Sequence, residues 1–253
     1  MLKIFTKTKI FILDTLFPIS CLSCNKDDAW LCENCLENIN LLSFQVCPKC
    51  EDTVTEYGQL CRNCKTTSDL DALVVALKYQ DNHIDKFVHL YKYRFVEDLH
   101  IPLGKIIVEA ILNSGLPMPD IIIPVPLHKR RLRWRGFNQS ELLAKYVSQN
   151  LTPGFEIPVF SNLLTRHKYT PPQMKIGKYA DRQKNMRNAF AFNHKSDSFQ
   201  QLEQLEHSNK YNVLLVDDIS TTGSTLFECA KVLKQNGAKK VFGAVIARQD
   251  MKN

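Results

Sequence analysis

The sequence predicts an α/β protein built on a parallel sheet, with a small cysteine-rich module ahead of it. Near the C-terminal end, the apolar run Val213–Val216, apolar residues at helical spacing (Leu226, Ala230 and Leu233) and the apolar run 241–247 follow one another. This strand–helix–strand order needs a crossover connection, which makes the sheet parallel. Nearer the N-terminal end, eight of the nine cysteines occur in pairs of one spacing, which is typical of a separate metal-binding module.

The composition fits one buried core plus a smaller module. The chain has 253 residues, of which 44% are hydrophobic and 23% are charged, and its formal net charge is +7. A mildly basic surface suits anionic ligands or nucleic acid, but the charge alone does not choose between them. Because no run of about eighteen apolar residues occurs, we expect no membrane span.

Residues 1–20 superficially resemble an export signal, since lysines precede the apolar residues 10–13. Asp14 interrupts the apolar run, and Pro18 stands where a lipoprotein cleavage site would have leucine. We therefore expect a short amphipathic helix here and a cytoplasmic protein whose cysteines stay reduced.

The paired cysteines predict two structural zinc sites. Two cysteines two residues apart form a knuckle whose thiolates reach one ion, and two knuckles complete a tetrahedral site. The short gaps favour sequential pairing of the knuckles, while interleaved pairing also satisfies the spacing. Disulfides are disfavoured in a reducing compartment. The module is expected to span residues 1–68, with the ligands Cys21, Cys24, Cys32, Cys35, Cys47, Cys50, Cys61 and Cys64.

Residues 69–253 have the composition of an α/β domain. Residues 72–77 predict a strand, residues 84–91 have helical spacing, and Pro102 opens a second helix that ends near Gly115. Between these helices, Lys92 and Arg94 alternate with tyrosines. In the simplest interpretation both are solvated positions beside buried rings.

A basic segment follows the next predicted strand, Ile121–Ile123. Six cationic or potentially cationic side chains occupy eight positions: His128, Lys129, Arg130, Arg131, Arg133 and Arg135. Such a group cannot lie in a core, so we expect a polyanion beside it. The phosphates of a small ligand fit, and so does the backbone of DNA or RNA, with Trp134 and Phe137 available for stacking.

The loop after Val216 combines two carboxylates with a hydroxyl-rich stretch. Backbone N–H groups at a helix start, together with hydroxyl donors, can bind a phosphate monoester without a lysine. The residues expected to do so are Ser220, Thr221, Thr222, Gly223, Ser224 and Thr225. We expect Asp217 and Asp218 to accept hydrogen bonds from a ribose diol, with a magnesium ion nearby. Cys229, on the following helix, is expected to be a small core residue.

The segment VLLVDDISTTGST resembles the phosphoribosyl pyrophosphate (PRPP) signature of type I phosphoribosyltransferases. Joined to PVPL…RGFNQSELLA and the four cysteine pairs, it makes nearly the whole chain similar to the ComF family. The resemblance implies a type I phosphoribosyltransferase fold, a parallel sheet flanked by helices, preceded by a double zinc ribbon. It also implies transfer of a ribose phosphate from PRPP with magnesium. Asp217 and Asp218 would hold the ribose, and the departing pyrophosphate would contact Arg133, Arg135 and Lys92.

The resemblance further implies a role in DNA uptake during natural transformation, and it leaves the acceptor open. An active transferase is one class of function. The alternative is a non-catalytic module that responds to PRPP or a nucleotide and binds single-stranded DNA or competence proteins, such as a DNA helicase or DNA-processing factors. A third class, an adaptor that has lost ligand binding, is disfavoured by the intact acidic pair and hydroxyl loop.

Two further segments follow from the family pattern. A T-x-x-Q motif followed by R-x-x-N and an aromatic strand is expected to be a mobile loop that closes over PRPP, matched here by Thr170, Gln173, Arg182, Asn185 and Ala189-Phe190. The polar stretch His194–Lys210 departs from the pattern, and we expect it to be an insertion with little order.

Overall fold

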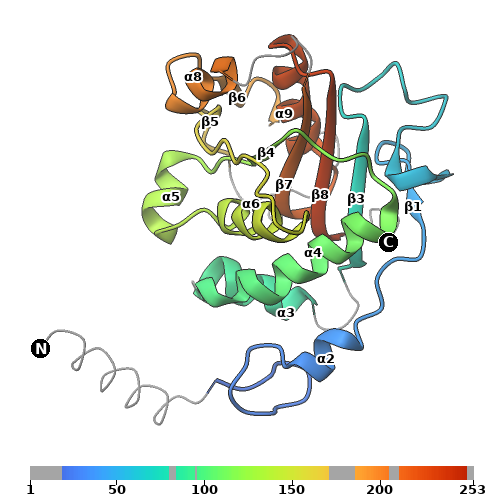
Figure 1. The fold of residues 1–253 in the computed structure, drawn as a ribbon, viewed down its shortest axis with the longest axis vertical. Helices are drawn as coiled ribbons and strands as arrows, with labels where there is room; N and C mark the ends of the chain where they lie inside the picture. The colour runs from blue at the N-terminus through green and yellow to red at the C-terminus, as the bar shows by residue number, and fades with distance from the viewer. Residues whose placement is uncertain (1–18, 80–83, 95, 171–185, 205–210, 250–253) are drawn as a thin grey trace, which may run out of the picture.

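The computed structural model describes residues 19–79, 84–94, 96–170, 186–204 and 211–249 (Figure 1). The strands are β1 (Gln45–Val46), β2 (Val54–Thr55), β3 (Ala72–Lys78), β4 (Ile121–Pro124), β5 (Leu164–Arg166), β6 (Phe190–Phe192), β7 (Asn212–Ser220) and β8 (Lys240–Arg248). The α-helices are α2 (Glu33–Glu37), α3 (Ile84–His89), α4 (His100–Ser114), α5 (Lys129–Arg135), α6 (Gln139–Asn150), α8 (Asp197–Gln204) and α9 (Ser224–Gln235). Short helical turns are η1 (Glu56–Gly58), the π-helical η3 (Leu90–Arg94) and η4 (Glu97–Leu99).

The central sheet has four parallel strands in the order β3-β8-β7-β4. The unit β7–α9–β8 is the strand–helix–strand crossover that the sequence predicts, with Val213 beside Val241. Strand β3, predicted over residues 72–77, and helix α4, which ends at Gly115 with φ of 74°, are also confirmed. Because all four strands run in one direction, their carboxyl ends meet at one edge of the sheet, where α/β proteins bind ligands.

The strands read as uninterrupted apolar runs because both faces of the sheet are covered. On β7, Leu214 and Val216 pack into a cluster with α3, α4 and α6, whereas Val213 and Leu215 pack into a second cluster with α9 and the hairpin β5–β6. Figure 1 shows α4 and α6 in front of the sheet and α9 behind it. Cys229 is fully buried in the second cluster, as expected.

The cysteine-rich segment covers the open edge of β3. The side chain of Gln45 bonds both backbone groups of Val75: its Nε2 donates to the carbonyl oxygen (3.0 Å), and its Oε1 accepts from the N–H (2.9 Å). The N–H of Leu42 donates to the carbonyl of Ala76 (2.9 Å). An edge strand with unpaired backbone groups invites aggregation, so these bonds protect the sheet (Figure 1).

The structure adds one helix to those predicted and corrects one expectation. Residues 129–135 of the basic segment, for which no secondary structure is predicted above, form helix α5, whose first turn is capped by His128 Nδ1 accepting from the N–H of Arg130. The stretch 194–210, expected to have little order, contains helix α8. Ser196 caps this helix by accepting from the N–H of Phe199 (3.1 Å), and Phe199 and Leu202 pack against the second apolar cluster.

Some expectations lie outside the described residues. These are the amphipathic helix over residues 1–18, residues 205–210, and the positions Gln173, Arg182 and Asn185 of the proposed mobile loop. Across the described ranges, no helix has the length and apolar character needed to cross a membrane.

Candidate functional site

A cavity of about 500 Å³ opens at the carboxyl edge of the sheet. All four strands contribute to its lining. Tyr79 follows β3, Val125 follows β4, Gln249 follows β8, and β7 contributes its last residues before the hydroxyl loop. The volume is within the range of sites that enclose a small-molecule ligand.

The two carboxylates lie inside β7 rather than after it, since the strand continues to Ser220. Asp217 Oδ1 accepts hydrogen bonds from the Ser140 hydroxyl (2.8 Å) and from the N–H of Asp218 (2.9 Å). Asp218 Oδ1 accepts from the N–H of Ile219 (2.6 Å) and forms an ion pair with Lys92 Nζ (2.9 Å). Burial, and next the charge of Asp218, raise the pKa of Asp217 to about 7.

The hydroxyl loop divides into residues that line the cavity and residues that shape the loop. Thr221 and Thr225 line the cavity. Ser220, Thr222 and Ser224 are buried, and the Thr222 hydroxyl donates to the Ser224 hydroxyl (2.8 Å). The loop therefore presents fewer hydroxyls to a ligand than the sequence suggests, and the bond between Thr222 and Ser224 stabilises its conformation.

Gly223 allows the loop to turn into α9. Its φ of 71° is left-handed, and a Cβ at this position would lie 2.8 Å from the ring of Phe227. Any larger residue would therefore suffer both backbone strain and a clash.

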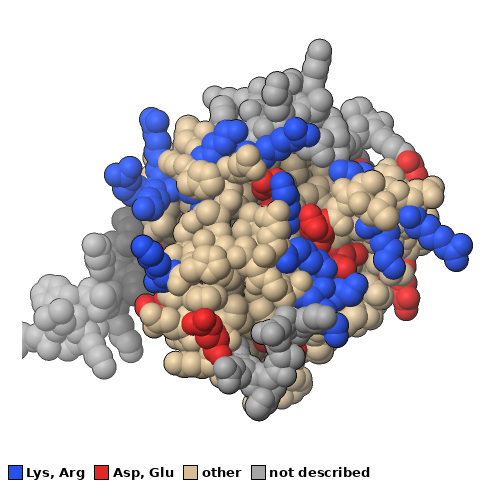
Figure 2. All heavy atoms as spheres, turned by 90° about the horizontal axis from the view of Figure 1, so that it is seen from above, with Lys and Arg blue, Asp and Glu red and all other residues tan. Residues whose placement is uncertain are grey.

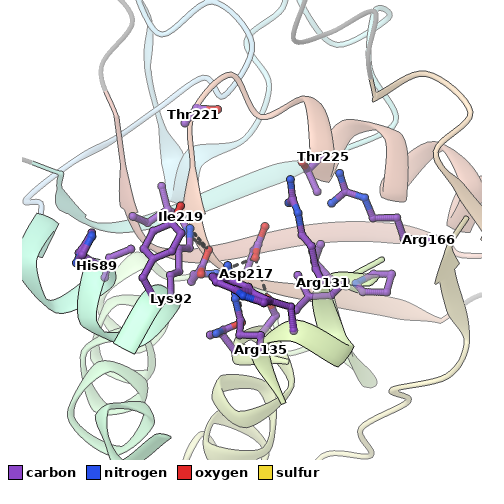
Figure 3. Close-up of a pocket in the computed structure, with 18 of the residues that line it drawn as sticks. His89, Lys92, Arg131, Arg135, Arg166, Asp217, Ile219, Thr221 and Thr225 are labelled. Atoms are coloured by element: carbon purple, nitrogen blue, oxygen red, sulfur yellow. Dashed lines mark hydrogen bonds and ion pairs between the residues drawn. The ribbon is translucent and has the colours of Figure 1, made fainter. Parts of the chain in front are cut away.

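Helix α5 contributes several cations to the cavity that holds the acidic pair. Arg130, Arg131 and Arg135 line the cavity, whereas Arg133 is exposed and is absent from the lining. In Figure 3, Arg131 lies to the right of Asp217, Lys92 to its left and Arg135 below it. The sequence therefore identifies the right basic segment, but it does not identify which of the arginines in that segment face the site.

Arg135 is held by a small buried network. Its Nη1 donates to Gln139 Oε1 (2.6 Å). Gln139 Nε2 in turn donates to the backbone carbonyl of Tyr91 (3.1 Å), and the Tyr91 hydroxyl donates to the backbone carbonyl of Gln139 (2.9 Å). Since Tyr91 and Lys92 are neighbours in η3, the network ties the helix turn that carries Lys92 to the helix that carries Arg135. Both cations are thereby fixed relative to the acidic pair.

Arg166 is the cavity residue that sequence reasoning missed. It ends β5 and is only 9% exposed, and its Nη2 donates to the Thr170 hydroxyl (2.6 Å). Arg131 Nη2 donates to the carbonyl of the same Thr170 (2.6 Å), so two guanidinium groups meet at one residue. Within the described ranges, neither arginine forms an ion pair with a carboxylate. The alternation of Leu164, Thr165 and Arg166 was a usable signal, because it places a charge on the buried side of a strand.

The cysteines form two compact clusters in sequential order, as the short gaps favoured. One comprises Cys21, Cys24, Cys32 and Cys35, the other Cys47, Cys50, Cys61 and Cys64, and within each all sulfur atoms lie within 4.8 Å of one another. Cys24 and Cys32 sulfurs are 3.6 Å apart, and Cys50 and Cys61 sulfurs are 3.9 Å apart. A tetrahedral ion with Zn–S bonds of about 2.3 Å separates its ligands by about 3.8 Å, so both clusters fit structural zinc.

Comparison with known proteins finds the same two parts. Residues 12–65 match the family model described as a double zinc ribbon domain. The chain is 31% identical to Competence protein F of Haemophilus influenzae, over 83% of this chain and 87% of that protein. It is 30% identical to DNA utilization protein YhgH of Escherichia coli (78% and 81%) and 24% identical to Competence protein ComFC of Bacillus subtilis (84% and 81%). The chain therefore belongs to the ComF family of competence and DNA-utilisation proteins, with a double zinc ribbon toward its N-terminal end.

Proposed function

We propose that this protein binds PRPP with magnesium and transfers its ribose 5-phosphate to an acceptor, as a cytoplasmic phosphoribosyltransferase that serves the uptake or use of DNA. One observation carries the proposal. A single cavity brings together the acidic pair of β7, two threonines at the start of α9 and arginines from two separate segments. These groups suit a ligand with three parts: the threonines would bind a phosphate, the carboxylates a diol and the arginines a diphosphate.

The charges around the cavity support a polyanionic ligand. The lining contains five side chains that are cationic at neutral pH, namely Lys92, Arg130, Arg131, Arg135 and Arg166, against the two carboxylates Asp217 and Asp218. Only Lys92 forms an ion pair with that acidic pair among the described residues. Guanidinium groups bind phosphate oxygens in a bidentate manner, which suits the diphosphate end of PRPP.

Each group has a role that follows from its chemistry. Asp217 and Asp218 would accept hydrogen bonds from the ribose hydroxyls, and Thr221 and Thr225, with the backbone of the loop, would bind the 5′-phosphate. Arg131, Arg135 and Arg166 would stabilise the leaving pyrophosphate. Arg133, which the sequence assigned to this role, is exposed. Magnesium would neutralise part of the diphosphate charge.

Such a transferase works mainly by positioning and charge stabilisation. The bond between the ribose C1 and the pyrophosphate breaks while the acceptor bonds to C1, and the transition state resembles an oxocarbenium ion. Asp217 and Asp218 lie where negative charge would stabilise that cation, and the arginines take up the charge of the leaving group.

The experiment is a binding and turnover comparison. Titration calorimetry with ribose 5-phosphate and with PRPP and magnesium should detect binding to the wild type, and Asp217→Asn/Asp218→Asn should weaken it by at least tenfold. Asp98→Asn, an exposed carboxylate outside the cavity, is the matched control. Pyrophosphate release with a panel of acceptors then separates an active transferase from a module that only binds PRPP. Absence of binding to any phosphorylated pentose would end the proposal.

A second candidate function is binding of single-stranded DNA, by itself or alongside competence proteins. The observation that favours it is an exposed face of α5, where Arg133 is exposed and Trp134 is 60% exposed. On the same helix, the guanidinium groups of Arg130 and Arg131 lie 5.1 and 5.9 Å from the ring centroid of Tyr169, which is 45% exposed. Aromatic rings interleaved with arginines suit stacked bases and a phosphate backbone. Figure 2 shows lysine and arginine side chains spread over one face of the molecule with acidic ones among them.

This second function is tested by salt-dependent affinity for an oligonucleotide. Arg133→Ala and Trp134→Ala should each weaken binding of single-stranded DNA severalfold. Arg133→Ala should leave PRPP affinity unchanged, because Arg133 is outside the cavity, whereas Trp134 is part of the cavity lining. An affinity for DNA that neither substitution alters would argue against this surface.

A further inference from the structure

Arg248 joins the second cysteine cluster to the hydroxyl loop. It is the last residue of β8 and is only 6% exposed. Its Nη2 donates to the carbonyl of Pro48 (2.9 Å) and pairs with the carboxylate of Glu51, while its Nε donates to the carbonyl of Thr221 (3.4 Å). Pro48 and Glu51 belong to the knuckle formed by Cys47 and Cys50. One side chain therefore contacts both a metal-binding knuckle and a residue that lines the cavity.

The same knuckle also reaches the loop from another direction. Lys49 Nζ lies 5.1 Å from the centroid of the Phe227 ring. That ring occupies the space beside Gly223, where an added Cβ would be 2.8 Å from it. The knuckle thus contacts, through Lys49, the side chain that limits the turn into α9.

A backbone bond completes the connection. The N–H of Gln249 donates to the carbonyl of Ser220 (3.0 Å), so the chain that carries Arg248 is itself bonded to the start of the hydroxyl loop. Gln249 also lines the cavity. A displacement of Arg248 would therefore disturb the hydrogen bonds to the backbone carbonyls of both Ser220 and Thr221.

The shape of the knuckle depends on its cluster. Glu51 has a φ of 62°, which a non-glycine residue rarely adopts, and its N–H donates to the carbonyl of Cys47 (2.9 Å). Such a conformation persists only where the surroundings impose it. Here that constraint is the convergence of Cys47 and Cys50 with Cys61 and Cys64, which a metal ion bound by the four sulfurs would maintain.

We propose that Arg248 is a positioning residue through which the second cysteine cluster sets the conformation of the phosphate-binding loop, so that loss of metal from this cluster lowers affinity for a phosphorylated pentose. This inference rests on the proposed function in one respect, that the loop at 220–225 binds the sugar phosphate. The physical coupling between knuckle and loop does not depend on it.

The first test removes the polar contacts of Arg248 in the zinc-loaded protein. Arg248→Met should weaken binding of ribose 5-phosphate about tenfold and leave binding of inorganic pyrophosphate with magnesium unchanged, because the arginines of the cavity are not held by Arg248. The matched control is Gln45→Met, which removes polar contacts of a similarly buried side chain between the module and the sheet but does not touch the loop. It should leave both affinities unchanged.

The second test removes the metal from the second cluster alone. Cys64→Ser should lower the measured zinc content by one ion per chain and produce the same selective loss of ribose 5-phosphate affinity. In both variants, hydrogen–deuterium exchange of the amides of residues 220–225 should become faster. This last readout needs no ligand, and it stays informative if a variant is less stable, because exchange elsewhere in the sheet serves as its internal reference.

The outcomes separate the alternatives. Unchanged ribose 5-phosphate affinity together with unchanged exchange of the loop in Arg248→Met and Cys64→Ser would overturn the coupling. An equal loss of pyrophosphate affinity would also overturn it, since Arg248 would then act on the whole fold rather than on the loop. If the wild type does not bind ribose 5-phosphate, the proposed function fails, and exchange of the loop amides alone decides the coupling.

Discussion

Asp217 and Asp218 are adjacent in β7, yet the fold gives them different partners. Asp218 has a cation, Lys92, at 2.9 Å, whereas Asp217 accepts hydrogen bonds from the Ser140 hydroxyl and a backbone N–H and forms no ion pair with any residue that the structure describes. Because successive residues of a strand point to opposite sides, two neighbouring carboxylates meet two environments. The pair is therefore asymmetric before any ligand binds.

This asymmetry predicts a pH dependence of stability. Burial raises the pKa of Asp217 to about 7, so the folded protein retains a proton that the unfolded chain releases near pH 4. The contribution of Asp217 to stability is thus fully present below about pH 4 and is lost as the pH rises through about 7. Urea unfolding of the ligand-free protein should show the free energy of unfolding falling between about pH 4 and about pH 7 and levelling off at higher pH.

Asp217→Asn should flatten that profile and stabilise the protein at pH 8 by about 2 kcal/mol, because the amide oxygen still accepts both hydrogen bonds and carries no charge. The same substitution should weaken ribose 5-phosphate binding. Parallel pH profiles for the wild type and the variant would contradict the shifted pKa.

At the residue scale, sequence patterns indicate which polar segments lie near the site better than they indicate which side chains of those segments point into it. The acidic pair and the hydroxyl loop are local in sequence, and both carboxylates line the cavity together with Thr221 and Thr225 of the loop. Arg133 and Arg135 are two positions apart and looked equivalent, but the helical geometry of α5 exposes the first and buries the second. Arg166 reaches the site only through tertiary folding, since its strand belongs to the β5–β6 hairpin.

The elements around the site depend on one another through η3 and α6. The buried hydroxyl of Tyr91 and the amide of Gln139 form two reciprocal bonds between these segments, at 2.9 and 3.1 Å. A π-helical turn is rare and often marks a functional position. Here it places Lys92 beside Asp218, while Gln139 holds Arg135.

Tyr91→Phe should therefore affect both stability and ligand binding. Loss of the hydroxyl leaves a buried carbonyl without its donor, which should cost about 1 to 2 kcal/mol in the free energy of unfolding. Since Gln139 positions Arg135, affinity for pyrophosphate with magnesium should fall severalfold. The control is Tyr211→Phe. The Tyr211 hydroxyl donates to the carbonyl oxygen of Asn236 (3.1 Å), and Tyr211 is not part of the cavity lining.

The control variant should lose a similar amount of stability and keep its affinity for pyrophosphate. Equal affinities for the two variants would show that η3 and α6 only stabilise the fold. Chemical denaturation and titration calorimetry on the same preparations give both quantities.

The β7–α9–β8 unit could be predicted because the spacing of its apolar residues and the residues that end its helix indicate the same elements. An apolar run is followed by apolar residues at helical spacing, and Gly237 follows the helix. Helices α5 and α8 could not be predicted with the same rules. In α5 the run of cations indicated a ligand-binding segment, although several of its residues favour a helix. In α8 the polar composition indicated little order, although Ser196 caps the helix and Phe199 and Leu202 are apolar residues that can pack against the core. Tertiary contacts and a cap decide these short helices.

At the scale of the whole molecule, the zinc ribbon is part of the packing of the sheet. Cys21, Leu31 and Cys32 belong to the same buried cluster as α3, α4 and α6, and Gln45 bonds the edge of β3. The boundary between residues 68 and 69 therefore separates two segments of the sequence that pack against each other in the structure.

Removal of zinc should therefore destabilise the parallel sheet as well as the ribbon. We expect two zinc ions per chain by metal analysis, and a chelator strong enough to remove both should lower the melting temperature of the whole protein by about 10 °C or more, since each kcal/mol shifts a domain of this size by about 2 to 4 °C. The uncovered edge of β3 should then promote aggregation, which light scattering records. A calorimetric transition of the sheet that keeps its temperature after both ions are lost would show that the ribbon folds independently of it. Comparison with Gln45→Met, which keeps both ions but loses the bonds to Val75, separates the contribution of the metal from that of the covered edge.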